Sequence, residues 1–146
     1  MPFKFRLEKV LDIRKDELEE AQRALADAFR LVEQAKKNLE EAKKLLKEAH
    51  EDMIKQNYEM AEAHLRLIRQ REEGLKNREI ELKQAEDNVV QKRQELLEAK
   101  IKVEALEKLK EKKEAEFIEE ENRQEQKITD ERATLKYVRK MRGEEL

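Results

Sequence analysis

The sequence has no cysteine and no tryptophan, and its 146 residues include only one proline and two glycines. Without cysteine the chain can form neither disulfides nor cysteine-ligated metal sites, which fits a reducing compartment. Proline and glycine are the residues that most disfavour helix interiors, so their scarcity favours long helices. No apolar run approaches the length needed to span a bilayer. We therefore expect long helices in a soluble, cytoplasmic protein without a direct membrane span.

The sequence also lacks an excess of either charge and any motif of catalysis. Its 34 basic and 36 acidic residues nearly cancel, whereas nucleic-acid binding requires a basic excess that displaces counterions. There is no glycine-rich phosphate loop and no HExxH motif. His50 and His64 have no metal-ligand spacing around them. We expect no enzyme activity, no catalytic or metal-binding residue, no cofactor and no nucleic-acid partner.

What the sequence does contain is a seven-residue repeat. A large apolar residue recurs at every seventh position from Leu18 onward, and a second row, mostly alanine, follows three residues later. Alternating steps of three and four residues are typical of a left-handed coiled coil. The predicted seam consists of Leu18, Ala21, Leu25, Ala28, Val32, Ala35, Leu39, Ala42 and Leu46, and then of Leu75, Leu82, Ala85, Val89, Leu96, Ala99, Val103 and Leu106.

This seam needs a partner helix, and the position at which the chain turns back determines which residues of the two helices face each other. A turn at Gly74, the only interior glycine, would set the apolar first half against residues 119–127, which contain no apolar side chain. A turn at residues 55–58 instead pairs Leu25 with Val89 and Leu39 with Leu75. Asn57 can adopt the left-handed conformation that such a turn requires. We therefore prefer the second turn, and Gly74 then marks a phase slip after Leu67.

The predicted fold is all-α: two long helices in an antiparallel coiled-coil hairpin, with the second helix longer and extending past the first. We expect a single domain over residues 1–146, with a helix at about 3–54, a turn at about 55–58 and a helix at about 59–142. Residues 114–131 carry eight acidic against two basic residues, and residues 132–143 carry five basic and no acidic residue. This last segment is either a solvated tail or an amphipathic end that awaits a partner.

Several apolar residues lie off the seam near the predicted turn: Leu45, Ile54, Tyr58, Leu65 and Ile68. They are either scattered surface residues or a docking patch.

The N-terminal sequence Phe3-Lys-Phe-Arg-Leu-Glu-Lys-Val-Leu-Asp-Ile-Arg14 is the most specific motif of the chain. Together with Glu104–Lys113, Asp130-Glu131-Arg132 and the chain length, it resembles the FliJ family. This family is the small coiled-coil component of the bacterial flagellar type III export apparatus. The resemblance covers nearly the whole chain.

The resemblance implies a coiled-coil hairpin similar to the central stalk of rotary ATPases. Its open end, with both termini, would enter the pore of the hexameric flagellar export ATPase and activate it. The family also contacts the cytoplasmic region of the export-gate membrane protein, and some members escort export chaperones. These partners imply a cytoplasmic protein that lies peripherally at the inner face of the cell membrane, at the flagellar base.

By matching position, the family's gate-binding surface corresponds to Asn38, Ala42, Leu45, Ala49, Leu67, Arg71, Gly74 and Arg78. Several of these are small or charged here, whereas family members often have larger apolar residues. Our own predictions for the export gate are Leu45, Tyr58, Leu67 and Ile68. Those for the ATPase ring are Phe3, Phe5, Arg6, Lys136, Arg139, Lys140 and Arg142.

Three alternatives remain open on the sequence alone. One is an escort chaperone for export substrates or for export chaperones. Another is a stalk subunit of a V/A-type ATPase, against which the N-terminal motif argues. The third is a generic coiled-coil tether. It would need the apolar row at residues 75–110 for oligomerisation, and the hairpin already buries that row.

Overall fold

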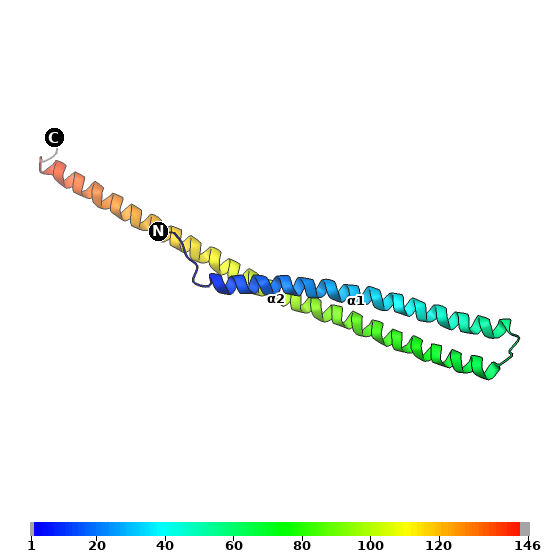
Figure 1. Ribbon diagram of the computed structural model, residues 1–146. Helices are drawn as coiled ribbons and strands as arrows, with labels where there is room; N and C mark the ends of the chain where they lie inside the picture. Colours follow the sequence, from blue (N-terminus) through cyan, green and yellow to red (C-terminus); the bar gives the residue numbers. More distant parts are fainter. Residues whose placement is uncertain (1, 144–146) are drawn as a thin grey trace. The chain divides into compact units, whose positions relative to one another are not determined.

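The computed structural model describes residues 2–143, and its regular structure consists of two helices. Helix α1 spans Glu8–Lys55, with 48 residues, and helix α2 spans Ala61–Met141, with 81 residues. Figure 1 shows the two helices side by side and antiparallel on either side of the turn that joins them. No strand occurs among the described residues. This confirms the predicted all-α hairpin and its longer second helix.

The packing divides the chain into two units, and each helix contributes to both. The turn unit comprises Lys15–Ile101, and thus the end of α1, the turn and the start of α2. The terminal unit comprises the N-terminal segment up to Arg14 together with the chain from Lys102 onward.

The chain reverses direction at residues 56–60, within the turn unit. Asn57, Tyr58 and Met60 have positive φ angles of 53°, 64° and 56°. Asparagine tolerates this conformation, whereas tyrosine and methionine do so at a cost of about 1–2 kcal/mol each. Backbone hydrogen bonds hold the turn: among them, the Tyr58 N–H donates to the Met53 carbonyl at 3.2 Å, and the Glu59 N–H donates to the Gln56 carbonyl at 2.9 Å.

Gly74 lies inside α2 and causes no break there. Nothing lies within 4 Å of the position that a Cβ would occupy at this residue, so its lack of a side chain serves no close contact. The phase slip expected at Gly74 is wrong. The left-handed turn residues let α2 start a new heptad at Ala61, and Ile68 and Leu75 follow at intervals of seven.

The centre of the turn unit is a small apolar core between the two helices. Ala28, Val32 and Val89 are buried together, and Leu25, Leu82 and Ala85 pack against them. Burying one valine side chain stabilises a fold by about 1.5–3 kcal/mol, and alanine lets the helices approach closely. Outside this core, the Arg93 guanidinium lies 5.3 Å above the centre of the Phe29 ring, which links the helices by a cation–π contact.

All residues of the predicted seam are buried or half-buried. The prediction omitted Leu11, which is the most buried large side chain, with 1% of its surface exposed. Leu11 lies one heptad before Leu18, so extending the repeat backwards identifies it.

In the terminal unit, α1 begins at Glu8 rather than at about residue 3. The Glu8 N–H donates to the Phe5 carbonyl at 3.1 Å, which closes a turn before the helix. The preceding residues form an arm instead of a helix, and the Phe3 ring packs against Phe117 of α2, with 5.5 Å between ring centroids. Beyond Phe117, the residues of α2 are exposed as far as its end at Met141, except for the half-buried Val138.

Candidate functional site

Exposed apolar side chains gather around the turn. We define the turn-end patch as Leu45, Ile54, Tyr58, Met60 and Leu65, all of which are exposed. They lie on the last turns of α1, on the turn itself and on the first turns of α2. Single exposed apolar residues are ordinary, but several at one end of a narrow two-helix unit form a surface on which another protein can dock.

The structure corrects one of the residues predicted to bind the export gate. Leu45 and Tyr58 are exposed and Leu67 is half-buried, but Ile68 is only 5% exposed. Ile68 occupies the seam because α2 starts its heptad at Ala61. It therefore serves the packing of the two helices and is not available to a partner.

The positions carried over from the family are also divided between core and surface. Ala49 is buried, and Asn38, Ala42, Arg71 and Gly74 are half-buried. Arg78 is exposed, and its guanidinium pairs with the carboxylate of Glu81 on the same helix at 2.8 Å.

Because Ile68 is buried and Leu45 and Tyr58 are exposed, alanine substitutions at these positions should differ in their effect on stability. Ile68→Ala removes a buried side chain and is expected to lower the free energy of unfolding by about 2–4 kcal/mol. Leu45→Ala combined with Tyr58→Ala removes exposed side chains and should leave the thermal midpoint within a few degrees of wild type. Circular dichroism melts measure both. Equal destabilisation by the two variants would contradict this division.

The second candidate surface lies in the terminal unit, where the N-terminal arm meets α2. The half-buried Phe3, Phe5 and Leu7 face Leu109 and Phe117 across a shallow groove. Arg6 is exposed beside them. The apolar residues of the predicted ring-binding motif thus pack partly against their own chain, and the arginine remains accessible.

An ion pair fixes the start of α1 against α2 in this unit. The Lys110 ammonium lies 3.1 Å from Oε1 and 2.9 Å from Oε2 of Glu8. The hydrogen bond from Lys110 to Glu8 is the main cause that raises the lysine pKa above its ordinary value of 10.5, while partial burial lowers it.

The raised pKa of Lys110 makes the contribution of the ion pair to stability depend on pH in alkaline solution. Because the pKa of Lys110 is higher in the folded chain than in the unfolded chain, its contribution is present between neutral pH and 10.5 and is lost as the pH rises through the folded-state pKa. The difference in thermal midpoint between wild type and Glu8→Gln should therefore be constant from pH 8 to 10 and shrink above that range. A difference that grows above pH 10.5 would contradict the assignment.

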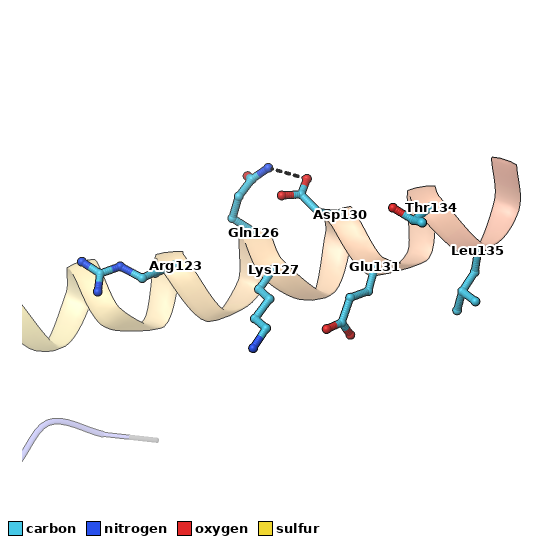
Figure 2. A pocket seen from close by; sticks show the side chains of 7 residues that line it. All are labelled: Arg123, Gln126, Lys127, Asp130, Glu131, Thr134 and Leu135. Atoms are coloured by element: carbon cyan, nitrogen blue, oxygen red, sulfur yellow. Dashed lines mark hydrogen bonds between the residues drawn. The ribbon is translucent and has the colours of Figure 1, made fainter. Parts of the chain in front are cut away.

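The third candidate surface is the single helix formed by residues 118–141 of α2. Figure 2 shows seven of its side chains, from Arg123 to Leu135, on one helix. The Gln126 side-chain amide donates a hydrogen bond to Asp130 at 3.0 Å, drawn as a dashed line. Arg123 pairs with Glu119 at 3.4 Å and with Glu120 at 3.3 Å. Such pairs three and four residues apart support a helix that has no neighbouring helix.

The residues predicted to bind the ATPase ring fall into two groups. Phe3, Phe5 and Arg6 lie on the arm beside Phe117, whereas Lys136, Arg139, Lys140 and Arg142 follow along α2 and are exposed. From residue 117 to residue 136 the helix rises by roughly 28 Å. The structure does not bring the two groups together into one contact area.

Within residues 2–143, no group of three or more acidic or histidine side chains is placed to hold a metal ion. Over the same range, neither helix has a stretch apolar enough to cross a bilayer.

Comparison with known proteins gives a family but no individual relative. No curated protein and no solved structure matches the chain. The model of the family described as flagellar FliJ protein matches residues 3–142, which include the arm, the turn and nearly all of α2. The chain therefore belongs to the FliJ family, whose members are components of flagellar protein export.

Proposed function

We propose that the chain is a non-catalytic stalk of the flagellar export apparatus. Its terminal unit enters the hexameric export ATPase and raises the rate of ATP hydrolysis, and its turn-end patch binds the cytoplasmic region of the export gate. The observation that carries this proposal is the family match over residues 3–142, which spans both surfaces. The site of action is the cytoplasmic face of the cell membrane, at the flagellar base.

The terminal unit has the features that insertion into a ring requires. Residues 118–141 form a single helix, which with its side chains is about 10–12 Å across. Its last turns carry Lys136, Arg139 and Lys140, all exposed. Basic residues at the C-terminal end of a helix are also favoured by the helix dipole. They form a cationic surface at this end of the helix.

The turn unit supports the second contact. The turn-end patch lies in a different unit from the arm and the basic residues, so one chain can bind the ATPase and the gate through separate surfaces. The patch is apolar, as the centres of protein interfaces often are. Export chaperones are further candidate partners for the same exposed apolar residues.

Measuring ATP hydrolysis by the purified export ATPase tests the proposal. Addition of this chain at one copy per hexamer should increase the turnover rate severalfold, and an excess should add nothing. As a control, a variant truncated after residue 117 keeps the paired helices but lacks the single helix, and it should not stimulate. An unchanged rate with the full chain would refute activation.

A further inference from the structure

We propose that the free chain forms an antiparallel dimer through residues 120–142 of α2. The partner is a second copy of this chain, because the acidic and basic halves of the single helix are complementary between two antiparallel copies. Self-association of this kind is distinct from ring binding, although it uses the same helix.

The first observation is that this helix exposes apolar side chains without a partner. Ile128, Leu135 and Met141 are exposed and Val138 is only half-buried, all on one half of the helix surface, whereas the exposed Tyr137 lies opposite Ile128. None of the helix from residue 118 to 141 packs against another described helix. A helix with this much exposed apolar surface gains stability when a second helix covers it.

The second observation is the separation of charge along the helix. Residues 114–131 carry eight acidic and two basic residues, and residues 132–142 carry five basic and no acidic residue. Arg123 is already paired with Glu119 and Glu120. Lys136, Arg139 and Lys140 form no ion pair with another described residue, so they are available to an acidic partner surface.

These two halves are complementary only when two copies run antiparallel. A two-fold axis between Glu131 and Arg132 lays the basic half of each copy along the acidic half of the other. The contact is isologous and closes on itself as a dimer. A parallel pair would oppose acid to acid and base to base, which is destabilising.

The same axis also brings apolar residues together. It places Ile128 of one copy opposite Leu135 of the other, and the symmetry makes this contact twice. Glu125 of one copy then lies opposite Val138 of the second copy, beside its basic turn at Lys136 and Arg139. The apolar pattern and the charge pattern therefore agree on one register.

The consequence, which rests on the proposed function, is that dimer formation competes with binding of the same residues to the ATPase ring. The dimer covers Lys136, Arg139 and Lys140, which the ring would bind. The free chain would thus be held in a form that has to dissociate before it enters the ATPase.

Single spin labels on the full chain test the orientation directly, because the sequence contains no cysteine. Each chain then carries one label, so every measured distance joins two copies. A label at Ala133→Cys lies near the proposed axis, and the expected distance is about 10–20 Å, given adjacent helices at 8–10 Å and the label length. A label at Asn122→Cys is displaced by roughly 28 Å along the axis and should give a distance above about 30 Å.

Charge reversal supplies the matched control. Lys136→Glu with Arg139→Glu and Lys140→Glu gives the basic half of the helix a net negative charge, whereas Glu125→Lys with Asp130→Lys and Glu131→Lys gives residues 122–142 a net positive charge. Each triple variant alone should sediment as a monomer, and an equimolar mixture should recover the dimer. Far-UV circular dichroism checks that both variants keep two folded helices.

Short distances at both labels would mean a parallel pair and would overturn the proposal. So would a wild-type chain that remains monomeric at high micromolar concentration and low salt, or charge reversal without effect. A monomeric chain that still stimulates the ATPase would refute this inference alone and leave the proposed function standing.

Discussion

Replacing Val89 by aspartate is expected to unfold the turn unit, whereas the same substitution at Val90 leaves it folded. These adjacent residues have the same side chain, but Val89 is 7% exposed and Val90 is 66% exposed. Val89 packs in the central core with Ala28 and Val32. An aspartate at this position loses the apolar contact and buries an unpaired carboxylate, which together cost about 3 kcal/mol or more. That is a large fraction of the total stability of a small domain.

Circular dichroism melts at neutral pH measure this contrast. Val89→Asp should lower the thermal midpoint strongly and reduce helicity at 25 °C, while Val90→Asp should shift the midpoint by only a few degrees. If both variants melted alike, the helix register that buries Val89 would be incorrect. Because the two variants have the same composition and net charge, only their position on the helix distinguishes them.

The second large effect concerns the basic end of α2. Lys136→Glu combined with Arg139→Glu and Lys140→Glu is expected to reduce stimulation of the export ATPase by more than tenfold. All three residues are exposed and lie on the single helix, so folding should not change. In the proposed complex the three cations attract acidic side chains of the ring, so each reversal replaces an attraction by a repulsion, and the attraction itself weakens with salt. The chain is assayed at low concentration, where copies do not associate.

The matched control reverses three lysines in the turn unit. Lys36, Lys43 and Lys47 are also exposed, so Lys36→Glu with Lys43→Glu and Lys47→Glu changes the net charge equally. This control should retain stimulation. Equal loss in both triple variants would mean that net charge, rather than the basic end of α2, governs activation.

The seam of α1 could be predicted from the sequence because two rows repeat without interruption. Leu18, Leu25 and Val32 recur at intervals of seven, and alanine follows each by three residues. Only one helix period fits this pattern. The hairpin with its turn near residues 55–58 could also be predicted. The charged segment around Arg123 offers no apolar partner to the first helix, whereas Val89 and its neighbours do.

The heptad phase of α2 could not be predicted, although its start was expected near residue 59, because the phase depends on backbone conformations that sequence preferences disfavour. Tyr58 and Met60 adopt positive φ angles, which neither residue type favours. These angles end α1 and let a new heptad begin at Ala61. The position of Ile68 changed with it, from the expected surface to the seam.

The N-terminal arm was missed for a different reason. Phe3 and Phe117 are far apart in sequence, and no local pattern indicates that their rings meet. Extending the α2 heptad beyond Val103 reaches Lys110 and then Phe117. Lys110 interrupts the apolar row, which hid the continuation of the repeat, and its ion pair with Glu8 explains why a lysine is accommodated there.

A three-component capture assay measures whether one chain links the export ATPase to the export gate. The cytoplasmic region of the gate is immobilised, and retention of the ATPase is measured with and without this chain. The chain should increase retention. Leu45→Ala with Tyr58→Ala should lose this effect while still stimulating hydrolysis, and the triple reversal at Lys136, Arg139 and Lys140 should lose both. Retention that is unchanged by the wild-type chain would mean that the chain does not form the proposed link.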